Sequence, residues 1–395
     1  MILLTIAIIA LDIVAVRRLA RHSQHRLLWV ATAVAADIAP IAISMGVLMT
    51  ATADNTSAAM TASAWAFFSY MVLCVARIPL NIAIVCSRRR WVRLGGGIVT
   101  AVTIVTLFYG MVVTRTDYHI THHTIYSERL PKAFDGYKIV QLSDIHIGSM
   151  LSPEEELTRI VSLCNAEKAD MVAFCGDLVN VRYDELKSEY AAILAQLKAR
   201  DGVYSVTGNH DTGIYMRHGG LSAEENTSRL IALQQQMGWH TLEDSTTHIH
   251  RAGDSIALTG VAFSDKLQEY RHSFELPYID LKEAYKGSDR ASFNITILHI
   301  PQTWESILQD SLADLTLSGH VHAMQLKLPI GRRGLSPAMF GYKRWSGLYH
   351  EQGRYLYIND GIGNVLFPLR IGAKPEITVI TLRCREELQS ADSLR

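Results

Sequence analysis

One stretch of this chain constrains its fold more than any other: an apolar run at residues 137–140, followed by Gln-Leu-Ser-Asp-Ile-His-Ile-Gly at residues 141–148. The apolar run is typical of a buried strand. Asp144 and His146 follow it two residues apart, and on an extended backbone side chains at that spacing point to the same side. A carboxylate and an imidazole at the end of a strand can bind one metal ion, but the tripeptide alone is a weak signal.

Further polar motifs follow other predicted strands. Strands are expected at 170–175 and 202–207, with helices at 152–168 and 183–200, where Ser152, Pro153 and Glu155 form a predicted capping box. Two more strands are expected at 291–298 and 315–317 in a second half richer in strands. The polar residues that follow these strands are Asp177, Asn209, His210, Asp211, His299, His320 and His322.

The position of these residues is more informative than their type. In α/β layers, ligands bind beyond the carboxyl ends of the strands. Taken singly, Gly-Asp is a common turn, Asn-His-Asp is a polar loop, and a lone histidine is most often a surface or core residue. The ordered set, with one motif at the end of each strand, therefore predicts a metal site rather than a series of ordinary loops.

The first 113 residues have a different composition from the rest and predict a membrane anchor. They hold four apolar segments, at 1–16, 27–50, 64–86 and 95–113. Each is about as long as a bilayer crossing requires, which is ~20 residues. The first segment lacks the basic start of a signal peptide and is followed by arginines, so we expect a membrane helix there too.

The loops between these segments predict which side of the membrane each part occupies. Arginines gather in the first and third loops, whereas the second loop, at 51–63, holds no lysine or arginine. Basic loops stay in the cytoplasm. We therefore predict an integral membrane protein in which everything after residue 113 lies on the extracytoplasmic side.

Asp12, Asp37 and Arg77 are ionisable residues inside the apolar segments. Such groups are expensive in a bilayer and usually face protein partners. They form either an ion or substrate path or a structural pair, for example Asp37 with Arg77, and the structural alternative is favoured.

Domain boundaries follow from composition. We expect a four-helix transmembrane anchor at 1–113, a polar linker at 114–134 with three histidines, a soluble domain at 135–384 and a polar tail at 385–395. The formal net charge is zero, which gives no support for a nucleic-acid partner. The five cysteines are scattered and are interpreted as small buried hydrophobic residues rather than disulfides.

The ordered set Asp-x-His, Gly-Asp, Gly-Asn-His-Asp, His and Gly-His-x-His resembles the calcineurin-like metallophosphoesterase superfamily. Over about residues 130–382 the chain looks most like its membrane-anchored bacterial YkuE-like branch. The resemblance implies an α/β fold of two packed β-sheets flanked by helices, preceded here by the α-helical transmembrane region. One departure is visible: Ala323-Met324-Gln325 stands where the branch usually has Gly-Gly-Gln, so we expect larger side chains to narrow the floor of the site.

The resemblance also implies two divalent metal ions, Mn, Fe or Zn. The first ion would be held by Asp144, His146 and His322, the second by Asn209, His299 and His320, with Asp177 bridging the two. A hydroxide between the ions would attack phosphorus. His210 would stabilise the developing charge or protonate the leaving oxygen, and Asp211 would orient His210. Candidate substrate contacts are Asn180 and Arg182, which follow the Gly-Asp motif, and Tyr342, Arg344 and Arg370. Arginine forms bidentate contacts with phosphate.

The function expected from these features is that of a membrane-anchored phosphohydrolase. It would cleave a phosphomonoester, phosphodiester or pyrophosphate in a small-molecule, lipid-linked or envelope substrate, with membrane lipids as neighbours. One alternative is an enzyme resembling UDP-2,3-diacylglucosamine pyrophosphatase, but its nucleotide-linked substrate is normally cytoplasmic. A second is a non-catalytic metal-binding sensor, which the complete set of ligands argues against. A third is a transporter, which the few polar positions in the apolar segments argue against.

Overall fold

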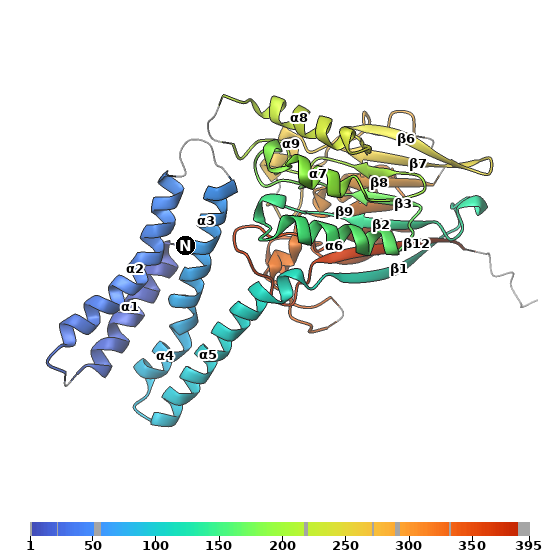
Figure 1. Ribbon diagram of the computed structural model, residues 1–395. Helices are drawn as coiled ribbons and strands as arrows, with labels where there is room; N and C mark the ends of the chain where they lie inside the picture. The colour runs from blue at the N-terminus through green and yellow to red at the C-terminus, as the bar shows by residue number, and fades with distance from the viewer. Residues whose placement is uncertain are drawn as a thin grey trace, which may run out of the picture. The chain divides into compact units, whose positions relative to one another are not determined.

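The computed structural model describes residues 2–21, 23–50, 57–216, 220–270, 272–288, 293–331 and 333–385. Residues 386–395, most of the expected polar tail, lie outside this described part. The chain divides into two compact units (Figure 1). The helical unit comprises Met1–Arg115 and Val365–Ile371, and the second unit comprises Thr116–Asn364 and Gly372–Arg395.

The helical unit is built from the apolar segments expected to form helices. Its helices are α1 (Ile2–Leu19), α2 (Arg26–Thr50), α3 (Ser57–Leu73), α4 (Ile78–Cys86) and α5 (Arg90–Val112), with the 3-10 turn η1 (Val75–Arg77) between α3 and α4. Within the described residues, two helical stretches are long and apolar enough to cross a membrane, Ala59–Cys86 and Arg90–Thr116. The four expected segments are thus helical, and two of them meet this test.

A cluster of charged residues joins three elements of the helical unit. Arg77 Nη2 lies 2.9 Å from Asp12 Oδ2 and also contacts Asp37. Asn81 donates a hydrogen bond to Asp12 from α4. Asp12 and Asp37 are almost fully buried, so the guanidinium compensates carboxylates that water cannot reach. The predicted contact between Asp37 and Arg77 is confirmed, and Asp12 joins it.

The second unit contains two six-stranded sheets, and the predicted fold class is confirmed. The first sheet has the order β1-β12-β2-β3-β4-β5, and the second has the order β10-β11-β9-β8-β7-β6. Their bounds are β1 (His119–Ser127), β2 (Lys138–Leu142), β3 (Met171–Phe174), β4 (Val203–Ser205), β5 (Trp239–Thr241), β6 (Ser245–Arg251), β7 (Asp254–Val261), β8 (Asn294–Leu298), β9 (Leu315–Ser318), β10 (Gly347–Glu351), β11 (Arg354–Ile358) and β12 (Glu376–Cys384).

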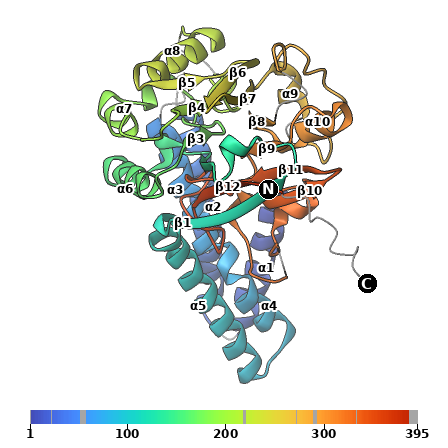
Figure 2. The ribbon, with the colours of Figure 1, turned by 90° about the vertical axis from the view of Figure 1, so that its right-hand side faces the viewer.

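The alternation of side chains along the strands builds two layers of core. Ile139 of β2 packs in a cluster with Ile295 and Leu317 from the second sheet. The next residue, Val140, faces the other way and packs with Leu157 of α6. Helices flank the sheets (Figure 2): α6 (Pro153–Ala166), α7 (Ser188–Leu194), α8 (Ala223–Gln236), α9 (Asp265–Tyr270) and α10 (Trp304–Asp310).

Strand direction places the polar motifs together. Strands β2, β3, β4 and β5 are mutually parallel, and so are β7, β8 and β9. The carboxyl ends of parallel strands meet at one edge of a sheet. The residues that follow β2, β3, β4, β8 and β9 therefore converge at the same end of the unit.

The expected linker at 114–134 contains a nine-residue strand, β1. Strand β1 pairs in parallel with β12 from His119↔Glu376 to Ser127↔Cys384. It is rich in β-branched residues, and because it lies at the edge of the sheet most of its side chains reach solvent. That exposure explains why its composition resembles a linker.

Two helix predictions also need correction. The expected helix at 183–200 is the 3-10 turn η5 (Tyr183–Glu185) followed by the shorter α7. Ser152 makes no side-chain cap at the start of α6. Glu156 accepts the backbone N–H groups of Leu151 and Ser152 instead, at 3.2 and 3.0 Å. The Glu156 carboxylate therefore supplies the hydrogen-bond acceptor at the start of α6 that the Ser152 side chain does not supply.

Candidate metal centre

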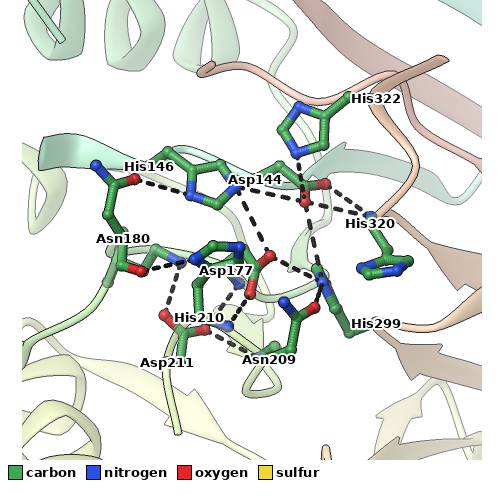
Figure 3. Close-up of polar contacts among 12 residues, drawn as sticks. Asp144, His146, Asp177, Asn180, Asn209, His210, Asp211, His299, His320 and His322 are labelled. Carbon is green, nitrogen blue, oxygen red and sulfur yellow. Dashed lines mark hydrogen bonds and ion pairs between the residues drawn. The ribbon is translucent and has the colours of Figure 1, made fainter. Parts of the chain in front are cut away.

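Asp144 and His146 reach the site through a backbone conformation that the sequence did not predict. Both are fully buried, and both are left-handed, with φ of 55° and 47°. The loop after β2 therefore does not continue as an extended strand. It coils, and the two side chains converge because of that turn rather than because of strand alternation (Figure 3).

The first group of candidate ligands consists of Asp144, His146 and His322. One ligand atom from each lies within 4.8 Å of those of the other two. His322 Nε2 is 3.0 Å from Asp144 Oδ1, and His146 Nε2 is 3.9 Å from the same oxygen. This is the set expected for the first ion.

The second group consists of Asp177, His299 and His320, again within 4.8 Å of one another. His299 Nε2 lies 3.0 Å from Asp177 Oδ2 and 3.0 Å from Asn209 Oδ1. Asp177 Oδ2 is also 3.7 Å from His146 Nε2. Asp177 therefore lies between the two groups, at the position expected for a bridging ligand.

Hydrogen bonds fix which nitrogen of each imidazole faces the carboxylates. His146 Nδ1 is 3.0 Å from Asn180 Oδ1, and His299 Nδ1 is 2.7 Å from the carbonyl oxygen of Cys175. Both oxygens are acceptors, so each Nδ1 donates its proton and leaves the Nε2 side for an ion. Metal-binding histidines commonly have such a partner on the other nitrogen. His146 Nε2 is buried and makes no hydrogen bond among the described residues.

The electrostatics of the centre favour a bound cation. Burial lowers the pKa of His146 to about 3, so its imidazole is neutral and has a free lone pair. Burial acts in the same direction on His299, but Asp177 and Asp144 outweigh it and raise its pKa to about 9. The two carboxylates thus attract positive charge to the Nε2 side of His299, which is the side that an ion would occupy. The mixture of carboxylate, imidazole and amide donors fits divalent metal ions.

His210 lies beside both groups. Its Nδ1 is 2.6 Å from the carbonyl oxygen of Asn180, so it carries a proton, and its backbone N–H donates to Asp177 Oδ1 at 2.8 Å. The ring packs edge-on against His146, with centroids 4.8 Å apart. Burial lowers the pKa of His210. One ring nitrogen also falls within 4.8 Å of ligand atoms of His146 and Asp177.

Asp211 has a different role from the one expected. Its carboxylate is fully buried and accepts backbone N–H groups from two loops, those of Asp177, Leu178, Val179 and Gly208, at 2.7 to 3.2 Å. It therefore holds the Gly-Asp loop against the Gly-Asn-His-Asp loop. The group that orients His210 is the backbone carbonyl of Asn180.

Two of the arginines expected to bind substrate are engaged elsewhere. Arg344 is 6% exposed, and it forms ion pairs with Glu305 and Glu351, both at 2.6 Å. Arg370 is fully buried in the segment that belongs to the helical unit. Both side chains are thus paired or buried in this structure, and their assignment as substrate contacts stays a prediction.

Two residues contribute to the site in ways that sequence reasoning missed. Asn180, expected to contact substrate, is 2% exposed and holds His146 with its side chain and His210 with its carbonyl. Its place three residues after Asp177 was the available signal. Tyr215 accepts a hydrogen bond from Asn209 Nδ2 at 2.9 Å and packs on His210, with ring centroids 4.4 Å apart. Nothing in the local sequence marks Tyr215.

The expected narrowing of the site floor is only partly matched. Ala323 is fully buried beside His322, whereas the side chain of Met324 is 42% exposed. Both residues are left-handed, with φ of 46° and 49°. The backbone here follows a path that suits glycine, and the larger of the two side chains reaches solvent.

These loops, placed at the ends of parallel strands, define the class of protein: a metal-dependent hydrolase site on a two-sheet α/β fold. The family described as "Calcineurin-like phosphoesterase" matches residues 137–324. The uncharacterized metallophosphoesterase YkuE of Bacillus subtilis is 32% identical over 273 residues, which cover 67% of this chain and 85% of YkuE. A zebrafish transmembrane protein with metallophosphoesterase domain is 31% identical over 71% of this chain.

The chain belongs to the calcineurin-like metallophosphoesterase family and is a metal-dependent phosphoesterase. The predicted resemblance to the YkuE-like branch is confirmed. The chain spans 61% of the length of the zebrafish relative and 54% of a Caenorhabditis elegans putative metallophosphoesterase that is 28% identical. The names of the zebrafish relative and of a bovine relative, 28% identical over 75% of this chain, also describe transmembrane proteins. Together with the two apolar helices, this indicates membrane association.

Proposed function

We propose that the protein is a membrane-anchored phosphohydrolase with two divalent metal ions, and that it hydrolyses a phosphomonoester, phosphodiester or pyrophosphate. The observation that carries the proposal is the position of Asp177 between two groups of ligand atoms. A carboxylate shared by two such groups is what a dinuclear centre requires. Two ions held there would acidify a water molecule and neutralise the charge that develops on the phosphoryl oxygens.

The proposed ligands divide as the two groups suggest. Asp144, His146 and His322 hold one ion, and Asn209, His299 and His320 hold the other, with Asp177 shared. The protein itself supplies orientation: Asn180 and the carbonyl of Cys175 fix the imidazoles of His146 and His299. The donor atoms are thus set in place before substrate arrives, which lowers the cost of reaching the transition state.

His210 is proposed to act on the substrate rather than on an ion. Its Nδ1 proton is held by the carbonyl of Asn180, so the opposite nitrogen is the one that remains to donate to the leaving oxygen or to the developing charge. Burial lowers the pKa of His210, so proton delivery from the opposite nitrogen requires the imidazolium form, with a proton on both ring nitrogens.

The test uses the full-length chain in detergent with Mn²⁺ and bis-p-nitrophenyl phosphate. His210→Ala is expected to retain Mn²⁺ but to lose turnover by about 10² to 10⁴-fold, the range for a general acid. Asp177→Asn is expected to lose both Mn²⁺ and turnover. His250→Ala, at an exposed position of strand β6, is the control and keeps both. Full activity in the first two variants refutes the proposal, and Mn²⁺ binding without hydrolysis in the wild type indicates a sensor.

We further propose that the substrate is lipid-linked or part of the envelope and that the second unit lies on the extracytoplasmic side. The support is the distribution of arginines in the first and third loops and the apolar helices of the same chain. A tether to the membrane raises the effective concentration of a substrate confined to the same plane.

Fusions at the C-terminus test the side of the membrane. Alkaline phosphatase is expected to be active there and green fluorescent protein to remain dark. The opposite result places the site in the cytoplasm and moves a nucleotide-linked substrate, of the UDP-2,3-diacylglucosamine kind, to first place.

A further inference from the structure

An imidazole that is not a candidate ligand lies next to the second group of ligand residues. The ring of His272 faces that of His320, with centroids 6.1 Å apart and planes 27° apart. His320 is half-buried, whereas His272 is exposed, and both belong to the second unit. A substrate that reaches the second group from solvent would therefore pass close to His272. No sequence motif marks this histidine, because it follows a helix rather than a strand.

Tyr342 joins His272 to the same ligand. Its hydroxyl lies 3.4 Å from His272 Nδ1, a long hydrogen bond, and its ring meets that of His320 edge-on with centroids 6.1 Å apart. Tyr342 is 7% exposed and packs in a hydrophobic cluster with Trp304 and Trp345. A buried ring gives its hydroxyl a fixed position. The phenol is thus a firm support for the exposed imidazole.

The backbone of the loop at 272–276 is also held in place. The buried side chain of Gln302, from the segment after β8, donates from Nε2 to the carbonyl oxygen of Ser273 at 3.0 Å. Lys343 donates its backbone N–H to the carbonyl oxygen of Phe274 at 3.4 Å. The loop is therefore tied to the segment that follows a ligand-bearing strand and to the residue after Tyr342.

A comparable pair lies beside the first group of ligands. His210 packs on His146, and Tyr215 packs on His210 with ring centroids 4.4 Å apart. Each group thus has a neighbouring imidazole outside its proposed ligand set, and each of these imidazoles contacts a tyrosine. The pairs come from distant parts of the chain, one after β4 and the other after α9 and η8 (Pro337–Phe340).

We propose, on the basis of the metal site and the role of His210 proposed above, that His272 binds the substrate and that Tyr342 positions it. The leaving oxygen of a phosphoryl group at the centre would lie next to His210. A phosphomonoester has no second substituent, whereas a phosphodiester or a pyrophosphate has one. His272, beside the second group, is placed to donate a hydrogen bond to the oxygen atoms of that substituent. The substrate class is then a phosphodiester or a pyrophosphate rather than a phosphomonoester.

The test compares two substrates of the full-length protein in detergent with Mn²⁺, bis-p-nitrophenyl phosphate and p-nitrophenyl phosphate. We expect the wild type to have the higher kcat/KM on the diester. His272→Ala is expected to lower kcat/KM on the diester about tenfold, mainly through KM, because one hydrogen bond to the second substituent is lost. Its kcat/KM on the monoester and its Mn²⁺ affinity are expected to stay within twofold of the wild type.

His350→Ala is the matched control. His350 is also exposed and also contacts a tyrosine, since its ring stacks on Tyr355 with centroids 4.1 Å apart. Tyr355 pairs with Leu315, the first residue of β9, whereas the candidate ligands follow the last residue of that strand. This second histidine and tyrosine therefore lie at the other end of the sheet, and His350→Ala is expected to keep the wild-type preference for the diester.

Tyr342→Phe tests the positioning role, because it removes only the hydroxyl. We expect it to lower kcat/KM on the diester about threefold when His272 is present and to add nothing in the His272→Ala background. A purely structural role would lower activity by the same factor in both backgrounds. If Tyr342→Phe fails to fold, the exposed His272→Ala variant decides.

The outcomes separate this inference from the proposed function. A wild type that prefers the monoester, or a His272→Ala variant with the wild-type preference, overturns the inference. Equal losses on both substrates in His272→Ala overturn it as well, because they show no contact with a second substituent. A wild type that binds no Mn²⁺, or that hydrolyses neither substrate, overturns the proposed function itself.

Discussion

At the scale of single residues, the candidate ligands share an uncommon backbone conformation. Five of them have positive φ, namely Asp144, His146, Asp177, His320 and His322. Such a conformation costs a non-glycine residue about 1–3 kcal/mol and is maintained by surrounding contacts. Here those contacts are backbone hydrogen bonds, such as Asp144 N to Gly176 O at 2.9 Å. Part of the stability of the fold is therefore used to hold the site in shape.

Met324 carries the same strain without a role as a ligand. We predict that Met324→Gly stabilises the protein by about 1 kcal/mol, because glycine adopts positive φ without penalty. The control is Met339→Gly, since Met339 is also 42% exposed but does not have positive φ, and glycine there is expected to destabilise. Melting temperatures of the two variants check the prediction. Equal losses in both would show that the backbone at Met324 is not strained.

The sequence predicted which residues gather at the site better than it predicted what each one does. The predicted ligands lie together because each follows a strand, and strand ends are visible as apolar runs before polar motifs. The partners of Asp211 and Arg344 were not predictable. These partners depend on which loop or acidic residue lies opposite in the folded chain. The local sequence pattern does not reveal that Asp211 accepts backbone N–H groups or that Arg344 pairs with Glu351.

At the scale of elements, β1 shows what local pattern cannot reveal. A polar segment with exposed side chains has the composition of a linker, and only its pairing with β12 makes it a strand. That partner lies far along the chain, so no short window contains the evidence. Strands β2 and β3 were predictable because they are buried on both faces and read as short apolar runs.

His123 on β1 makes the stability of this edge depend on pH. Its ring lies 4.8 Å from that of Tyr357, and burial lowers its pKa, with Glu376 acting in the opposite direction. Below pH 6.5 the unfolded chain binds a proton that the folded protein accepts less readily, so the stability contributed by neutral His123 is lost as pH falls. We predict that His123→Phe flattens the fall in melting temperature between pH 7 and 5.

The neighbouring His122 offers a control for that experiment. Its side chain is 61% exposed on the same strand. His122→Phe tests whether adding an aromatic ring to β1 is enough to change the profile. Identical pH profiles for the wild type and His123→Phe would contradict the prediction.

At the scale of the whole molecule, we expect the stability of the helical unit to depend on the positive charge of Arg77. Asp12 and Asp37 are 2% and 1% exposed, and Arg77 contacts both. We predict that Arg77→Leu lowers stability by about 3–5 kcal/mol, because it leaves buried carboxylates without a counter-charge. The measurement is the melting temperature and the monodisperse fraction in detergent.

A compensating variant separates charge from packing in that cluster. Replacing Asp12 and Asp37 by asparagine and Arg77 by glutamine removes all three charges while keeping polar side chains of similar size. This triple variant is expected to recover much of the stability lost in Arg77→Leu. If Arg77→Leu melts at the wild-type temperature, the cluster contributes nothing and the ion-path alternative gains weight.

The order of strands in the first sheet has a consequence for biosynthesis. Strand β12 lies between β1 and β2, pairing in parallel with one and antiparallel with the other. Every candidate ligand up to His322 is translated before Glu376, yet the sheet that supports Asp144 and Asp177 stays open until β12 arrives. The candidate ligands are thus translated before the strand that completes their sheet, and we expect metal loading to follow the pairing of β12 with β1 and β2.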